Sequence, residues 1–202
     1  MPTLIATPGA ANANSYPTVA EAQAYYDTRI PGTVHDAWDN ADDQSVLLIN
    51  ATRLLDKLLQ PDVKQLFYQN GMAYYRIHPA WTGAAATTVQ RLAWPRIGMF
   101  DQNNNAIATN VIPQDLKDAV SEFAGQLGIA DRTLDNEVLN QGVKSIKAGS
   151  VAMSFDTAGL AVTYVIPDAV YNLLVASWYT NETYEPALSA IFDVVTQDDF
   201  TS

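Results

Sequence analysis

The clearest pattern along the chain is an apolar stripe that ends just before residue 60. Its members recur at steps of three and four residues, which places their side chains on one face of a helix. The stripe consists of Leu47, Leu48, Ala51, Leu54, Leu55, Leu58 and Leu59. This pattern predicts a helix that begins at Asn40 or Asp42, ends near Leu59 before Pro61, and buries one wide face.

Two further segments carry the signals of helices. Thr18 and Glu21 have the spacing of a capping box, which predicts a short helix from Val19 to Arg29. Pro113 suits the first position of a helix, and we expect a long helix from there to about Ile129. Its apolar face consists of Leu116, Ala119, Val120, Phe123 and Leu127.

Two shorter helical patterns follow towards the C-terminal end. A fourth helix is predicted from Pro167 to Trp178, and Glu185-Pro186 is a candidate start for a fifth. The apolar positions are Val170, Leu173, Leu174 and Trp178 in the fourth helix, and Leu188, Ile191, Phe192 and Val195 in the fifth.

Between the third and fourth helices the apolar period changes to two, which is typical of strands. Strand-forming residues fill roughly 144–155 and 160–166, and Asp156-Thr157-Ala158-Gly159 between them is a turn sequence. We expect a small antiparallel hairpin at about 144–166. Residues 64–88 carry a weaker signal, which predicts a long loop with a turn at Asn70-Gly71.

These elements together predict a mainly α fold, a bundle of four to five helices with a small antiparallel β-hairpin. A chain of 202 residues with 48% hydrophobic residues suffices for one domain with its own core. We expect this domain to span residues 16–195, with a flexible arm over 1–15 and a C-terminal tail over 196–202.

The segment Gln90–Arg96 lies between the two clearest predicted helices, the one that ends near Leu59 and the one that begins at Pro113. Because a residue before proline avoids the helical conformation, Trp94 is expected to project from a fixed point and pack between helices. Arg91 and Arg96 are then left at the rim, where each can take a carboxylate partner. The expected structural anchors are Trp94, Pro95, Arg91, Arg96, Arg53 and Asp56, the last two as a surface ion pair three residues apart on one helix.

The chain is strongly acidic, with 22 Asp and Glu against 11 Lys and Arg and a formal net charge of −11. Such a surface repels phosphate groups overall. It suits either an ordinary soluble protein or a surface past which DNA slides, and composition leaves both open. The absence of cysteine excludes disulfides and thiolate chemistry. No signal peptide or membrane span is evident, so we expect no membrane partner.

Candidate catalytic and metal-binding patterns are incomplete. The acids near His35 fit the start of a helix better than a metal site. The Asp101-x-Asn103-x-Asn105 pattern begins like a calcium loop, but Ala106 and Ile112 replace the glycine and the acid that such a loop requires. No nucleophile elbow, phosphate loop or zinc-binding helix motif occurs. We therefore expect no catalysis, no cofactor and no metal.

Aromatic residues and arginines interleave between residues 74 and 96, a composition that suits stacking on bases and neutralising phosphates. They are Tyr74, Tyr75, Arg76, Trp81, Arg91, Trp94 and Arg96. The excess of acids argues against such a role, and the same residues serve equally well as core and rim. Sequence-independent binding to a nucleic acid strand therefore stays open as an alternative.

Three segments together resemble one protein family. They are Ala51-Thr52-Arg53-Leu54-Leu55-Asp56, Gln90-Arg91-Leu92-Ala93-Trp94-Pro95-Arg96 and Ile112-Pro113-Gln114-Asp115-Leu116-Lys117-Asp118-Ala119. Their order and spacing are similar to those of the head–tail connector, or adaptor, proteins of tailed bacteriophages. Sequences of this kind are also labelled DnaT-like single-strand-binding proteins, and this label supplies the alternative function.

The resemblance implies a structural virion protein that is assembled in the host cytoplasm and resides at the neck of the virion. Its protomers would form a dodecameric ring that docks on the portal protein and offers an attachment surface to a tail or nozzle protein. The ring would extend the DNA channel, through which duplex DNA passes without specific binding. The expected interface residues are Phe200, Asp198 and Asp199 in the C-terminal tail, and Val151, Met153 and Phe155 in the hairpin.

Overall fold

The computed structural model describes residues 2–59, 64–69, 72–77, 81–101, 103–132, 145–148, 151–154, 165–174, 178–180 and 192–193. The helices in these ranges are α1 (Val19–Thr28), α2 (Thr33–Asp39), α3 (Gln44–Leu58), α4 (Gln114–Ile129) and α6 (Asp168–Leu174). The strands are β1 (Lys64–Gln69), β2 (Met72–Ile77), β3 (Ala84–Ala85), β4 (Arg96–Ile97), β5 (Met99–Asp101), β6 (Ser145–Ala148), β7 (Val151–Ser154), β8 (Trp178–Thr180) and β9 (Phe192–Asp193).

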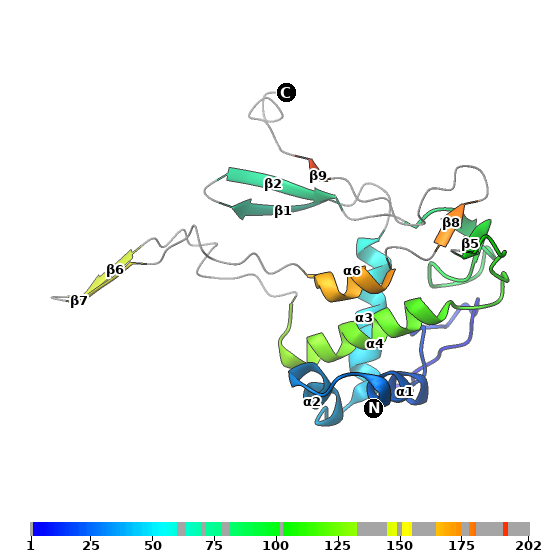
Figure 1. The fold of residues 1–202 in the computed structure, drawn as a ribbon, viewed down its shortest axis with the longest axis horizontal. Coiled ribbons are helices and arrows are strands. Elements are labelled where there is room, and N and C mark those ends of the chain that lie inside the picture. The colour runs from blue at the N-terminus through cyan, green and yellow to red at the C-terminus, as the bar shows by residue number, and fades with distance from the viewer. Residues whose placement is uncertain are drawn as a thin grey trace.

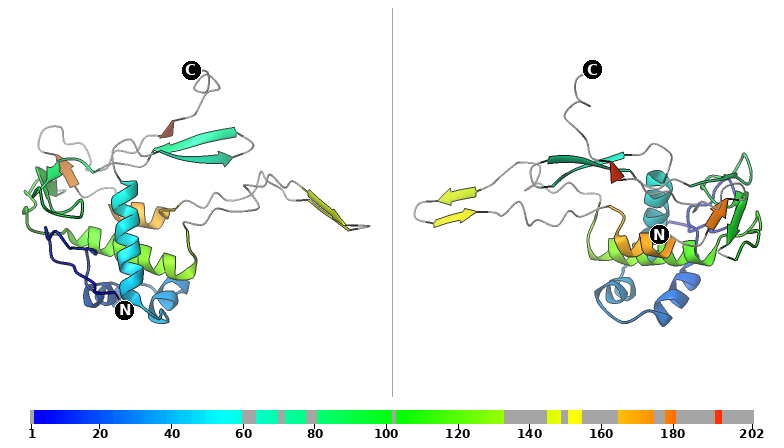
Figure 2. Two further views of the ribbon diagram at one scale, coloured as in Figure 1. Left: turned by 180° about the vertical axis from the view of Figure 1, so that it is seen from behind. Right: turned by 45° about the horizontal axis from the view of Figure 1, so that its top comes forward.

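Helix α4 is the centre of the helical body. It contacts α1, α2, α3 and α6, and it crosses α3 in Figure 1. Helices α1 and α2 lie at one end of α3, and the views in Figure 2 agree with this arrangement. The predicted mainly α fold with a small antiparallel hairpin is confirmed. Among the described residues, no helix combines the length and apolar character that crossing a membrane requires.

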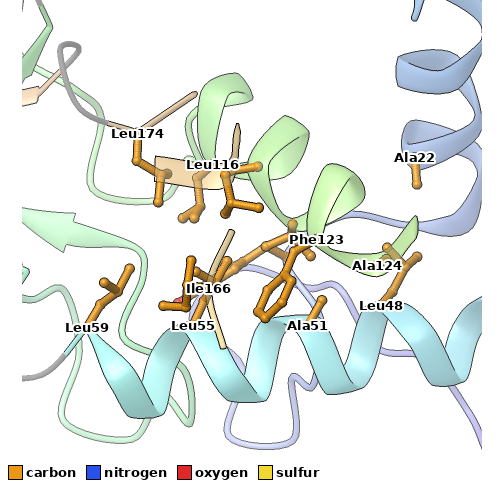
Figure 3. Packing of buried hydrophobic residues seen from close by; sticks show 14 of the residues in the cluster. Ala22, Leu48, Ala51, Leu55, Leu59, Leu116, Phe123, Ala124, Ile166 and Leu174 are labelled. Atoms are coloured by element: carbon orange, nitrogen blue, oxygen red, sulfur yellow. The ribbon is translucent and has the colours of Figure 1, made fainter. Parts of the chain in front are cut away.

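The core lies mainly between α3 and α4. Leu48, Ala51 and Leu55 of α3 are fully buried, as are Leu116 and Phe123 of α4, and Figure 3 shows these side chains between the two helices. A fully buried leucine or phenylalanine contributes about 1.5–3 kcal/mol relative to an exposed one. The apolar stripes predicted on both helices are therefore the faces that hold them together.

Side-chain hydrogen bonds cap the first turns of α1 and α3. At α1, the Glu21 amide donates to Thr18 Oγ1 (3.2 Å), and the Thr18 amide donates to Glu21 Oε2 (2.8 Å), which completes the predicted capping box. At α3, the Asp43 carboxylate accepts from the amides of Ser45 (3.0 Å) and Val46 (3.3 Å). These contacts satisfy amides that have no partner within the helix.

The strands form small antiparallel sheets. One contains β1, β2 and β9, and its register aligns Phe67 with Tyr74 and Gln69 with Met72. The others pair β3 with β4, β5 with β8, and β6 with β7. The β1–β2 hairpin lies where the sequence predicted a long loop, although its turn falls at the predicted Asn70-Gly71. Asn-Gly between two strands is a strong hairpin signal.

The hairpin predicted near residue 150 exists, but its turn was predicted in the wrong place. Strand β6 pairs with β7, and Ile146 lies opposite Met153. Two residues, Gly149 and Ser150, separate these strands, so the stretch 144–155 that we expected to be one strand contains both. A glycine-containing two-residue link suits a tight hairpin. Residues 155–164 lie outside the described ranges.

The predicted fourth helix was too long, and most of the predicted fifth helix lies outside the described residues. Helix α6 ends at Leu174, and Trp178, expected in the same helix, belongs to β8, which pairs with β5. Phe192, expected in a fifth helix, lies in β9 opposite Arg76. Pairing with strands distant in sequence decides the conformation in both places. Helix α2, by contrast, was not predicted, because its start at Gly32 has no side-chain cap.

Candidate functional site

Trp94 lies in the core, where it packs against a second indole. It is 1% exposed, and its ring packs edge-on against the ring of Trp81, with 5.8 Å between centroids and an interplanar angle of 85°. The peptide bond between Trp94 and Pro95 is cis. Because Trp81 is also buried, neither indole is a platform on which a base can stack.

Asp56 ties three parts of the chain together around Trp94. Its carboxylate accepts hydrogen bonds from the Tyr16 hydroxyl and from the Ala93 amide (2.9 Å). The Tyr16 hydroxyl in turn accepts from the Trp94 amide (3.2 Å). Helix α3, the segment before α1 and residues 90–96, here called the Trp94 segment, are thus held in one arrangement.

Arg53 and Asp56 do not form the expected surface ion pair with each other. Asp56 points inward to Tyr16 and Ala93, while Arg53 is exposed and donates to Asn50 Oδ1 (3.4 Å). Burial raises the pKa of Asp56 to about 6, even though the hydrogen bonds from Tyr16 and Ala93 and the charge of Arg96 act in the opposite direction.

Arg96 has a structural role. Its guanidinium donates to the carbonyl oxygens of Thr82 (2.5 Å), Gly83 (2.8 Å) and Ala93 (3.1 Å). The carboxylate partner that we predicted is thus replaced by backbone carbonyl groups within the described part of the chain. Arg96 thereby fixes the β3–β4 pair beside the Trp94 segment.

Arg91, by contrast, is exposed and lines a groove of about 380 Å³ between α3, the N-terminal segment and the Trp94 segment. We call it the cationic groove; its lining is Asn14, Ile49, Arg53, Asp56, Lys57, Arg91, Leu92 and Ala93. Arg53, Lys57 and Arg91 are all exposed, and none of them forms an ion pair with a carboxylate in the described ranges. Asp56 is the acid in the lining, and it is half-buried.

The N-terminal segment that forms one wall of this groove was expected to be a flexible arm. It folds back on itself, because the Asn14 amide donates to the Ile5 carbonyl (2.8 Å) and the Ile5 amide donates to Asn14 Oδ1 (2.7 Å). The Arg91 amide donates to the Ala10 carbonyl (3.4 Å). These contacts place Asn14 and Arg91 on the same groove.

A charge pattern in the sequence includes one wall of the groove, the one formed by Arg91, Leu92 and Ala93. Residues 63–100 contain none of the 22 acidic residues, although the whole chain is strongly acidic. They contain four of the 11 basic residues, Lys64, Arg76, Arg91 and Arg96, and the aromatic residues Phe67, Tyr68, Tyr74, Tyr75, Trp81, Trp94 and Phe100. The net charge of the whole chain does not show how charge is distributed along it, so this acid-free segment was not predicted to be functional.

A family model described as "Putative DnaT-like ssDNA binding protein" matches residues 3–185. The chain belongs to this family. No curated protein and no solved structure matches the chain.

The resemblance to head–tail connector proteins was therefore wrong, since the matching family is the DnaT-like one. The function that rested on it is corrected as well, including the dodecameric ring, the portal and tail or nozzle partners, and the channel for unbound duplex DNA. The family match favours the alternative that the sequence had left open. The virion location stays a prediction.

The interface residues predicted for that role fall into two groups. Phe155, Asp198, Asp199 and Phe200 lie outside the described residues. Val151 and Met153 lie on β7, which stands apart from the helices in Figures 1 and 2.

The two metal-site patterns rejected from the sequence are accounted for by local contacts. His35 Nδ1 lies 3.3 Å from Asp39 one helical turn away, and the Asp101 carboxylate accepts from the amides of Asn103 (2.9 Å) and Asn105 (2.8 Å). Within the described ranges, no group of three or more potential metal ligands comes together.

Proposed function

We propose that this protein binds single-stranded DNA through the cationic groove, as a binding protein without catalysis. The observation that carries the proposal is the presence of three exposed cations, Arg53, Lys57 and Arg91, around one groove of an otherwise acidic chain. Membership of the DnaT-like family, whose description names single-stranded DNA, supports the same conclusion.

The three cations supply what binding to a phosphate backbone requires. Each basic side chain that meets a phosphate releases condensed counterions, and this release drives association at low salt. Lys57 and Arg53 are one helical turn apart on α3, and Arg91 faces them from the Trp94 segment across the groove. Because Arg29 and Lys117 are already paired with Glu122 and Glu21, they contribute much less free positive charge.

The size of the groove favours a single strand. Its volume of about 380 Å³ is at the small end of the usual range of about 300–1,000 Å³ for ligand pockets, so we expect it to hold a short stretch of one strand. The acidic remainder of the chain repels a second backbone.

The β1–β2 hairpin is the candidate source of base stacking. It contains Phe67, Tyr68, Tyr74 and Tyr75 and no acidic residue. Lys64 is the fifth residue after Leu59, which itself directly follows α3, so the hairpin begins within about 18 Å of Leu59. Aromatic residues together with exposed cations are the combination that sequence-tolerant strand binding uses.

Fluorescence anisotropy with a labelled oligothymidine of about 16 nucleotides tests this function. The unaltered protein should bind it, and the affinity should fall as salt is added. Combining Arg53→Gln, Lys57→Gln and Arg91→Gln should make the slope of log affinity against log salt less steep by about 2, as expected for the loss of three phosphate contacts on a single strand.

Lys147→Gln is the control for loss of a positive charge outside the groove, because it removes one from β6. It should leave both affinity and slope near those of the unaltered protein. Equal binding by the triple variant, or equal competition by an unlabelled duplex of the same length, would count against the proposal.

A further inference from the structure

Asp56 occupies an unusual place in the cationic groove. It is the acid among the described lining residues, and it lies on α3 between Arg53 and Lys57 in sequence. Its hydrogen bonds hold the Ala93 amide and the Tyr16 hydroxyl, which belong to the other two walls. The carboxylate therefore fixes the distance between the cations of α3 and Arg91 of the Trp94 segment.

The negative charge of the same carboxylate also reduces the positive charge of the groove whose walls it holds together. Within the described ranges, the charged and titratable groups near Asp56 are Tyr16 from the N-terminal segment, Arg53 and Lys57 from its own helix, and Arg91 and Arg96 from the Trp94 segment. When Asp56 is ionised, it offsets one of the positive charges that a phosphate would meet. When it is protonated, the groove keeps its shape and gains one unit of positive charge.

Protonation is compatible with the observed hydrogen bonds. A neutral carboxylic acid can still accept from the Ala93 amide through its carbonyl oxygen. The protonated oxygen, Oδ1, keeps a lone pair that can still accept from the Tyr16 hydroxyl, and that hydroxyl still accepts from the Trp94 amide. The three walls therefore stay connected in either protonation state, and charge is what changes.

We propose that Asp56 is a positioning residue that makes single-strand binding depend on pH, so that the groove holds phosphate more tightly when Asp56 is protonated. This inference rests on the proposed function. Burial raises the pKa of Asp56 to about 6, which brings the change of charge close to neutral pH. Binding and protonation are reciprocal, so a bound strand should raise this pKa further.

The test compares the unaltered protein with Asp56→Asn, which keeps the shape of the side chain without its charge. Affinity for oligothymidine is measured by anisotropy between about pH 5 and pH 7.5 at constant salt; thymine keeps one protonation state across this range. Near pH 7.5 the variant should bind about five-fold more tightly, an estimate for removing one partly screened charge beside a phosphate. The difference should close towards pH 5. His35 and His78 are common to both proteins, so any contribution from histidine titration cancels.

Unfolding in urea provides a second readout on the same two proteins. Because the pKa of Asp56 is raised in the folded protein, its contribution to stability is present below the pKa of the unfolded chain and is lost as the pH rises through about 6. As the pH rises from the unfolded pKa of Asp56 to above about 6, the free energy of unfolding of the unaltered protein should therefore fall relative to that of Asp56→Asn.

The pKa of Asp56 in the unaltered protein, followed by carbon-13 NMR, keeps the inference testable if the variant does not fold. It should rise when oligothymidine is added. An unchanged pKa, or parallel pH profiles of affinity for the two proteins, would overturn the role of Asp56 while leaving strand binding intact. Absence of binding by both proteins at every pH would overturn the proposed function and this inference together.

Discussion

Replacing Gly125 with alanine should destabilise the folded protein by about 3 kcal/mol, as expected when a methyl group is forced into a packed interior. An added Cβ would collide with the Tyr26 hydroxyl and would lie 2.7 Å from Val34 Cγ1 and 2.9 Å from the Val34 carbonyl oxygen. The Tyr26 hydroxyl cannot easily yield, because it donates to the Ser121 carbonyl (2.6 Å). Helix α4 would have to move away from both α1 and α2.

The sign of this effect distinguishes packing from helix propensity. At an open helix position, exchanging glycine for alanine stabilises by up to about 1 kcal/mol. Gly128→Ala on the same helix is the control, because its Cβ would lie no closer than 3.2 Å to Ala37 and 3.4 Å to Leu47. Urea unfolding should show a large loss for Gly125→Ala and a change within about 1 kcal/mol for Gly128→Ala. Similar values for both variants would contradict the close approach at Gly125.

Glu122→Ala should cost about 3 kcal/mol, because it removes a buried carboxylate and leaves the partly exposed Arg29 guanidinium without its partner. The Glu122 side chain is 3% exposed and accepts from Arg29 Nε (2.6 Å) and Nη2 (3.0 Å), as well as from Tyr25 and Gln126. Burial by itself would raise the pKa of Glu122, but the hydrogen bonds from Arg29, Gln126 and Tyr25 outweigh it and lower the pKa. The contribution of Glu122 to stability is therefore present above its unfolded pKa and is lost as the pH falls through its folded value.

Lys117→Met is the control for this prediction, since the pair between Lys117 and Glu21 joins the same two helices, α1 and α4. Both members of that pair are substantially more exposed than Glu122, so its loss should cost less than about 1 kcal/mol. The two free energies of unfolding are measured in urea at neutral pH. Equal losses from the two variants would show that burial does not distinguish the pairs.

The parts of the fold that sequence predicted are those set by local signals. The capping box of Thr18 and Glu21 marks the start of α1, and Pro113 marks the start of α4. The stripe around Leu55 identifies the buried face of α3. Each signal lies within a few residues of the element that it specifies, so no knowledge of the tertiary structure is needed.

The parts that it missed depend on distant partners. Trp178 lies in a strand because β8 pairs with β5, where Asp101 is its partner. Phe192 lies opposite Arg76 in the same way. In the β1–β2 hairpin, the Asn70-Gly71 turn signal was noticed, but the flanking residues lack a clean alternation of apolar and polar positions. Context overrides the local pattern in each case.

The groove was missed for a different reason. Arg53, Asp56 and Arg96 belong to the motifs that suggested a head–tail connector, and the roles of Asp56 and Arg96 in the structure are hydrogen bonds that fix the fold. Such motifs specify a packing arrangement, which does not determine function. The net charge of −11 then hid the exposed cations, because an average says nothing about where Lys57 and Arg91 come together.

The most direct test of the central claim is to find where a bound strand touches the protein. The unaltered full chain is irradiated with an oligothymidine that carries iodouracil, and the crosslinked peptides are identified by mass spectrometry. We expect adducts in residues 64–77 and in the peptide that contains Arg91 and Trp94, and we expect excess unlabelled single strand, but not duplex, to abolish them. Adducts concentrated on α1, α2 or the β6–β7 hairpin would contradict this account, as would their persistence in the triple variant of Arg53, Lys57 and Arg91.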